Sequence, residues 1–271
     1  MSHTTVTFNG STRARIDMRT LSQALNQTTS VSKIKKEPFL IGKKKTQIGD
    51  VFKISGQRLS KNIVLKNANN KMDYVGHKLN KNLTVEGDCG HYAGAQLAGG
   101  KLVINGNTLD YAGCNMKKGT IEIKGDAGNY LGSALASEKK GMSGGTILVH
   151  GNTGNFTGDL MRRGVIMVVG NIGDYCASRM VAGTITNLGA IGKNVGHGMR
   201  RGTLLLPHKP EDVTGFKDCG RHNLGYLTLL LHEMRRFEST FQSLHPMRRR
   251  VQRYEGDVSV DGQGEMLVWI G

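Results

Sequence analysis

The sequence has few residues of the kinds that stiffen or cross-link a chain. Of its 271 residues only four are proline and four are cysteine, and aromatic residues make up 6%. With so little proline, the 38 glycines do not indicate collagen or a proline-rich linker, but many tight turns that need a left-handed backbone or a close approach. The cysteines form no C-x-x-C pair, which is typical of separate thiols in a cytosolic protein: Cys89, Cys114, Cys176 and Cys219.

Long apolar runs and acidic residues are also scarce. No apolar run approaches the ~20 residues of a membrane-spanning helix, and the first ten residues contain no apolar segment of a secretory signal. We therefore expect a cytoplasmic protein with no membrane partner. Only 21 Asp and Glu face 37 Lys and Arg, and the net charge of +16 indicates either a soluble basic surface or an acidic partner.

What the sequence has instead is an internal repeat of nineteen residues. Units begin at residues 83, 102, 121, 147, 166, 185 and 204, and only the unit at 121 is longer, because of a seven-residue insertion around residues 134–140. The first and third positions are aliphatic in almost every unit, as in Leu102 and Ile104. In a strand these positions face the same way, so we expect both columns to point into a core. The second position is mixed in character, and we expect it to face outward to solvent, as at Val103 and Leu148.

Three further columns follow in each unit. The glycine pattern G-x-x-G-x-x-x-G is complete in four units, for example at Gly87, Gly90 and Gly94, and predicts corners without a Cβ. Asp or Asn follows the first glycine, where we expect it to hydrogen-bond turn amides. The tenth position is aromatic, which predicts a ladder of stacked rings: Tyr92, Tyr111, Tyr130, Phe156 and Tyr175, with Tyr74 after a one-residue shift.

These columns predict an all-β fold, a right-handed parallel β-helix (a solenoid) with G-x-x-G-x-x-x-G turns of about 19 residues over residues 48–206. Leucine-rich, hexapeptide and helical repeats fit the spacing less well. Residues 48–62 resemble a degenerate first turn.

The flanks are expected to close the ends of the solenoid. Residues 1–47 are expected to form a small α/β N-terminal cap with strands near Val6–Phe8 and Ile16 and a helix over 20–25. Residues 207–271 are expected to form a C-terminal helix and tail: apolar residues follow helical spacing over 227–244, and a last strand covers 265–270.

No specific catalytic constellation is present. The chain lacks H-E-x-x-H, G-x-S-x-G, P-loop and C-x-x-C motifs, and its histidines in the repeats fall in different columns. We therefore predict no catalytic residue, no metal site and no cofactor held by this chain itself.

The candidate binding residues are basic pairs at the last corner of alternate units. They follow a methionine and precede a glycine, as in Met161-Arg162-Arg163-Gly164, and two lysines of the insertion can extend the same edge. Charges that recur in register focus the electric field along a line, which suits an extended polyanion or an acidic subunit. A solvated corner is the alternative. The residues are Lys117, Lys118, Lys139, Lys140, Arg162, Arg163, Arg200 and Arg201.

The glycine-rich turns resemble two families that share such a β-helix. One is the C-terminal domain of the glutamate synthase large subunit, and the other is the C subunit of formylmethanofuran dehydrogenase, in the form found in bacterial formyltransferase/hydrolase complexes. The similarity is strong over residues 50–206. Chain length favours the second family, because the glutamate synthase domain normally follows large catalytic domains.

That resemblance implies a non-catalytic scaffold subunit of a complex that converts formyl-tetrahydromethanopterin to formate through a methanofuran-type carrier, in formaldehyde oxidation. The implied partners are a metal-dependent hydrolase subunit, a formyltransferase subunit and a molybdopterin-enzyme-like subunit. The family's bacterial carrier bears a polyglutamate tail, and we infer that the basic corner residues bind it.

Three alternatives remain at this stage. The chain could be the C subunit of a molybdenum or tungsten formylmethanofuran dehydrogenase, or a stand-alone acyl or formyl transferase. A nucleic-acid-binding protein is suggested only by charge. Since the chain lacks aromatics interleaved with basic residues and any groove-reading helix signature, we expect no nucleic acid partner.

Overall fold

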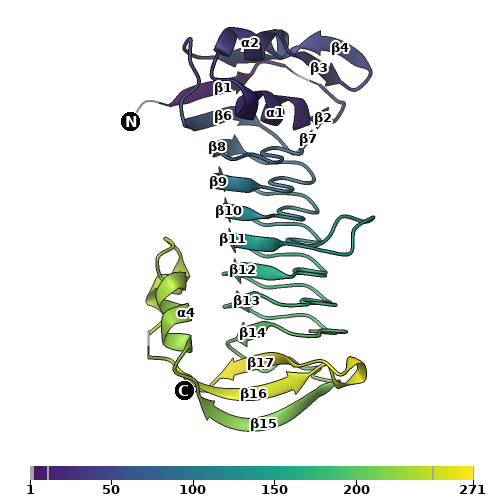
Figure 1. The fold of residues 1–271 in the computed structure, drawn as a ribbon, viewed down its shortest axis with the longest axis vertical. Coiled ribbons are helices and arrows are strands. Elements are labelled where there is room, and N and C mark those ends of the chain that lie inside the picture. Colours follow the sequence, from purple (N-terminus) through teal and green to yellow (C-terminus); the bar gives the residue numbers. More distant parts are fainter. Residues whose placement is uncertain (1–2, 11, 246, 271) are drawn as a thin grey trace.

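The computed structural model describes residues 3–10, 12–245 and 247–270. Its main feature is a row of parallel strands, each paired with the strand of the next repeat unit (Figure 1). The register follows the repeat, because Leu102 pairs with Leu83 on one side and with Ile121 on the other. An all-β fold with a large parallel sheet is therefore confirmed. The strands of this row are β6 (Asn62–Ala68), β8 (Asn82–Gly87), β9 (Ala98–Ile104), β10 (Lys118–Ile123), β11 (Ser143–Val149), β12 (Arg163–Val168), β13 (Thr184–Asn187) and β14 (Thr203–Leu206).

A second, thinner row of pairing follows the first glycine corner of each unit. Single parallel bridges begin between Cys89 and Thr108 and continue from unit to unit as far as Ile191. The inward columns form the core, since side chains such as Ile121 and Ile123 are completely buried within one apolar cluster. Five methionines from the last corners belong to the same cluster: Met116, Met142, Met161, Met180 and Met199.

Polar side chains hydrogen-bond along the stack. The Asp88 carboxylate accepts the backbone amide of Asn107 at 2.8 Å, and the Asn107 side chain accepts the amide of Asp126 at 2.8 Å. The same contact repeats as far as Ala190. The column after the first glycine thus bonds turn amides, as predicted. A second column, three residues later, does the same and was not anticipated: Asp110, Asn129, Asn155 and Asp174.

The aromatic column is a continuous stack of six rings. Centroids of neighbouring rings lie 4.6 to 5.1 Å apart, and the guanidinium of Arg19 covers the first ring, 4.6 Å from the centroid of Tyr74. All six residues have a left-handed backbone, with φ between 59° and 64°. That conformation is uncommon for a bulky side chain, so we infer that ring stacking offsets its cost.

The N-terminal elements pack over the first strand of the row. β1 (Thr4–Phe8) pairs in parallel with β6, whereas β5 (Phe52–Ile54) pairs antiparallel with β1. The expectation of a degenerate first turn over residues 48–62 is therefore wrong, because β1 takes the place of that turn. The expected early strands and helix are present. The remaining elements are β2 (Ile16–Asp17), α1 (Arg19–Gln27), α2 (Val31–Lys36), β3 (Pro38–Ile41), β4 (Lys44–Gln47), α3 (Ile48–Val51) and β7 (Met72–Asp73).

Three strands extend the sheet at its other end. β17 (Gly264–Trp269) pairs in parallel with β14, and β16 (Arg250–Gly256) and β15 (Phe216–Asn223) follow in antiparallel order (Figure 1). A short 3-10 turn, η2 (Val258–Val260), joins β16 to β17. Only β17 was expected; the other two strands have no clear alternation.

The C-terminal helix is shorter than predicted and lies against the side of the stack. α4 spans Leu227–Met234, and a separate 3-10 turn, η1 (Thr240–Ser243), follows, capped by the side chain of Ser239. One continuous helix over 227–244 is therefore wrong. Apolar residues of α4 and η1 cluster with Leu148, Met167 and Leu205 of the strands. These second positions were expected to face solvent, but α4 buries them.

Among the described residues, no helix combines the length and the apolar character that a membrane span requires.

Candidate functional site

The four arginines of the basic corners line one groove. Arg162 and Arg163 come from one unit and Arg200 and Arg201 from the second unit after it, and the groove between them has a volume of about 590 Å³. All four side chains are exposed. None of the ion pairs found among the described residues includes one of them, so their charges are free to meet an anion. The rest of the lining comes from Val181, Ala182, Val260, Asp261 and Gln263.

The corner sequence Met-Arg-Arg-Gly explains why these arginines point outward. Met161 is buried in the core and its backbone carbonyl accepts the amide of Val181 in the next unit. Gly164 has a φ of +102°, and a Cβ there would lie 2.6 Å from the carbonyl oxygen of Gly145. Only glycine fits this stacked corner, so the two residues between the buried methionine and the glycine must face solvent.

The lysines proposed for the same site lie elsewhere along the stack. Lys118 pairs with Ala98 in the preceding turn. Lys139 and Lys140 belong to the insertion, which Asn115 holds in place by donating to the carbonyl oxygen of Lys140 at 2.7 Å. Lys117, Lys118, Lys139 and Lys140 are exposed, but they do not line the arginine groove.

A second charged site, missed from the sequence, centres on Glu122. This carboxylate lies on the outer face of β10, where Lys101 Nζ approaches it to 2.7 Å and Lys124 Nζ to 2.5 Å, and His150 Nε2 lies 3.2 Å away. Burial would raise the pKa of Glu122, but the hydrogen bonds from Lys101 and Lys124, together with the charge of Lys101, lower it to about 2. Glu122 is therefore ionised at neutral pH and already satisfied by its cations.

The repeat contained a signal for part of this cluster. Lys124 and His150 both occupy the fourth position of consecutive units, so the register places them side by side. Glu122 is also the one acidic residue in the second positions of the units that begin at 83, 102, 121, 147, 166, 185 and 204.

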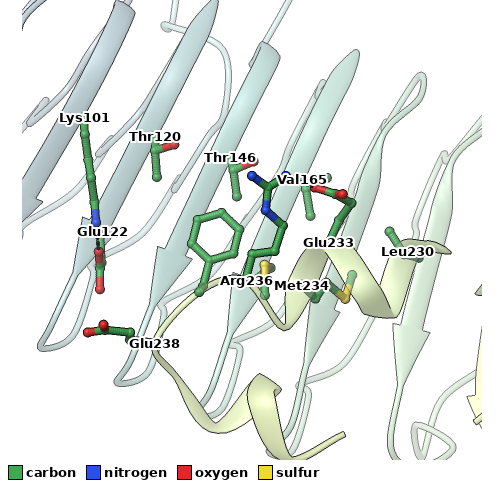
Figure 2. Close-up of a pocket in the computed structure, with 12 residues that line it drawn as sticks. Lys101, Thr120, Glu122, Thr146, Val165, Leu230, Glu233, Met234, Arg236 and Glu238 are labelled. Atoms are coloured by element: carbon green, nitrogen blue, oxygen red, sulfur yellow. Dashed lines mark hydrogen bonds and ion pairs between the residues drawn. The ribbon is translucent and has the colours of Figure 1, made fainter. Parts of the chain in front are cut away.

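Glu122 borders a groove between the outer face of the sheet and α4 (Figure 2). The volume of this groove is about 690 Å³, within the range of small-ligand sites. Figure 2 shows Glu233, Met234 and Arg236 on the helix side of the groove, and Glu122 with Lys101 on the strand side. Its charges are of both signs, and Glu233 is paired with Arg236 at 2.9 Å.

Burial keeps the cysteine thiols of the core in their neutral form. Burial raises the pKa of the Cys114 and Cys176 thiols to about 12, and it also raises the pKa of the Cys89 thiol. These thiols are therefore neutral at physiological pH. Within the described residues, no group of three or more His, Cys, Asp or Glu side chains is placed to hold a metal ion.

Comparisons with known proteins identify the family. A family model described as "GXGXG motif" matches residues 32–217. A chain in the crystal structure of the formyltransferase/hydrolase complex (FhcABCD) from Methylorubrum extorquens, determined in complex with methylofuran, is 33% identical to this chain. The match covers 98% of this chain and 100% of that chain, with a TM-score of 0.86. None of the curated proteins compared with the sequence matches it significantly. The chain thus belongs to the GXGXG-motif family and resembles the C subunit of formylmethanofuran dehydrogenase.

Proposed function

We propose that this chain is a non-catalytic scaffold subunit of a formyltransferase/hydrolase complex that converts formyl-tetrahydromethanopterin to formate through a methanofuran-type carrier in the cytoplasm. The observation that carries the proposal is the similarity, over nearly the full length of both chains, to a chain of the FhcABCD complex. Similarity that includes both flanks as well as the repeats suits a protein with the same neighbours.

The chemistry of the described side chains supports a structural role. The thiols of the core are neutral, and the Glu122 carboxylate is occupied by two lysines and a histidine. The side-chain oxygens of the polar columns accept hydrogen bonds from backbone amides of the next turn. These are features of a rigid support. We further propose that the stack is a right-handed β-helix, because crossover connections between parallel strands are usually right-handed. We propose three parts for the chain: the cap, which includes residues 1–47, the stack, which ends at residue 206, and the C-terminal region over 207–271.

The arginine groove is the proposed site for the polyglutamate tail of the carrier. A chain of carboxylates can pair with the unpaired Arg162, Arg163, Arg200 and Arg201, each of which offers a planar fork of donors. Lys117, Lys118, Lys139 and Lys140 would extend the cationic surface for a longer tail. The partners proposed are a metal-dependent hydrolase, a formyltransferase and a molybdopterin-enzyme-like subunit.

Assembly and activity together test the scaffold role. The chain, co-expressed with the three partner subunits, should elute with them from a size-exclusion column, and the purified chain by itself should not hydrolyse the formyl donor. Formyl turnover by the isolated chain would instead establish a stand-alone transferase. Molybdenum or tungsten that co-purifies with a formate-oxidising assembly would point to the dehydrogenase form.

A further inference from the structure

A second basic surface lies on the hairpin formed by β3 and β4, at the N-terminal end of the molecule (Figure 1). The strands pair antiparallel with Phe39 opposite Thr46 and Leu40 opposite Lys45. Alternation along the strand gives the hairpin two faces. Phe39 on the inner face is 2% exposed, whereas Leu40 on the outer face is 51% exposed.

Exposed lysines are concentrated on and next to the hairpin, and Lys45 lies directly opposite Leu40 in the register of the two strands. Lys43 lies in the turn of the hairpin, Lys44 and Lys45 on β4, and Lys36 at the end of α2, and all four are exposed. We call Leu40 with these four lysines the hairpin surface. None of the ion pairs found in residues 3–10, 12–245 and 247–270 includes any of the four lysines.

Two acidic residues lie close to the hairpin in the sequence: Glu37, which is exposed at the end of α2, and Asp50, whose carboxylate is engaged in local structure. The Asp50 carboxylate accepts the backbone amide of Gln47 at 3.0 Å and the hydroxyl of Thr46 at 2.9 Å, and so caps α3. These hydrogen bonds are the main cause of its lowered pKa, and Lys44 adds to the effect from a distance. The hairpin surface is therefore left with excess positive charge.

An exposed aliphatic residue with mainly basic neighbours is typical of a protein interface, in which the apolar centre is desolvated and the partner supplies the opposite charge. A second copy of this chain would bring the same positive surface and would be repelled. β4 is also the outermost strand of the sheet β4-β3-β2-β7, so no strand of the described chain covers it.

We propose that the hairpin surface docks an acidic patch on a different subunit of the complex, with Leu40 as the apolar contact at its centre. This inference rests on the proposed function, since it assumes a complex, but it is independent of the carrier site. The hairpin belongs to the cap, whereas the arginine groove lies between later turns and η2. One end of the chain would then hold a protein partner while the other holds the carrier.

The test is assembly of tagged variants with the co-expressed partner subunits, measured by size-exclusion chromatography and by the dissociation constant at several salt concentrations. Lys43→Glu, Lys44→Glu and Lys45→Glu together should weaken assembly by roughly tenfold or more, with a smaller salt dependence. Leu40→Ala should weaken it by roughly fivefold with the salt dependence unchanged.

Matched controls separate docking from charge in general. Lys193→Glu, Lys217→Glu and Arg221→Glu together make the same change in net charge away from the hairpin and should leave assembly intact. If the glutamate triple variant does not fold, the corresponding alanine triple variant replaces it, with thermal unfolding as the check.

The outcomes are distinguishable. If the wild-type chain assembles and neither hairpin variant weakens assembly, this inference is overturned and the proposed function stands. If the wild-type chain does not assemble with the partner subunits at all, both the proposed function and this inference are wrong. If the triple variant assembles normally but loses binding to a single-stranded RNA 20-mer or to phosphatidylserine vesicles, the surface serves that ligand and protein docking is wrong.

Discussion

The ring of Tyr111 stacks on the ring of Tyr130 with centroids 4.7 Å apart and ring planes 4° apart. The two residues are nineteen positions apart in the sequence and occupy the same place in consecutive turns. Residues at the same position of successive repeat units therefore lie in a line along the molecule. The stability of the stack and the position of its charged sites both depend on this correspondence.

Removing one ring should destabilise the whole stack. Tyr130→Ala is expected to lower the free energy of unfolding by about 2–4 kcal/mol, because it leaves a gap between Tyr111 and Phe156. Urea unfolding followed by circular dichroism measures the change. Tyr130→Phe is the matched control and should stay within about 0.5 kcal/mol, since Phe156 shows that the position does not need a hydroxyl. Equal losses for both variants would contradict stacking as the cause.

In the column of Asp and Asn residues that follow the first glycine of each unit, the carboxylates are separated by amides. This separation predicts how the stability of a variant should depend on pH. Asn152 lies between Asp126 and Asn171, and its side-chain oxygen accepts the amide of Asn171 at 2.9 Å. Asn152→Asp keeps this acceptor but places a carboxylate next to that of Asp126, which raises the pKa of the pair in the folded protein.

The stability of Asn152→Asp should therefore match the wild type near pH 3, below the unfolded pKa, and fall short as pH rises through the raised folded pKa, by about 1–2 kcal/mol at pH 7. Chemical unfolding at pH 3, 5 and 7 measures the difference. A deficit that is constant with pH would mean that lost hydrogen bonding, not repulsion, destabilises the variant.

The Glu122 cluster should stabilise the fold except in acid. The folded pKa of Glu122 is about 2, below its ordinary value of 4.5. Its contribution is thus fully present above pH 4.5 and is lost as pH falls toward 2. Glu122→Gln should lower the free energy of unfolding at pH 7 by about 1–2 kcal/mol, a figure reduced for screening by water in the adjacent groove.

Glu86→Gln is the control for that variant. Glu86 lies 3.5 Å from Lys66 and is 48% exposed, so its loss should cost less than about 0.5 kcal/mol. Unfolding of both variants at pH 2.5 and pH 7 decides the point. If Glu122→Gln is as stable as the wild type at pH 7, the lysines do not stabilise the carboxylate.

Docking of α4 should depend on the buried side chains that occupy the second position of the repeat units beneath it. Leu148→Thr removes a buried contact beneath α4 and should cost about 1–3 kcal/mol, with faster proteolysis near residues 225–245. Val103→Thr changes the same column outside the α4 cluster and should have little effect. Equal protease sensitivity of the two variants would contradict packing of α4 on this face.

The repeat columns were predictable because they depend on local period: Ile121 and Ile147 pair as their letters suggest, and Tyr111 stacks where the tenth position places it. Leu148 was misassigned to solvent because alternation places it on the outer face, and only the tertiary position of α4 covers that face. The same limit applies to β5, whose pairing with β1 joins residues almost fifty positions apart and carries no periodic signal.

The candidate sites divide in the same way. The arginines were predicted to lie together because they share a register, and Arg163 and Arg201 do line one groove. The lysines of the insertion have no register, so the sequence could not place them. The pairing of Lys124 with His150 was available from the repeat, but their attachment to Glu122 required side-chain geometry.

Native mass spectrometry of the complex, assembled from co-expressed subunits in the presence of the polyglutamylated carrier, tests the central claim most directly. The wild-type assembly should contain this chain and retain the carrier. An assembly with Arg162, Arg163, Arg200 and Arg201 all replaced by Ala should keep the chain but lose the carrier at moderate salt. A formyl-hydrolysing assembly that forms without this chain, or a variant that retains the carrier fully, would contradict the account.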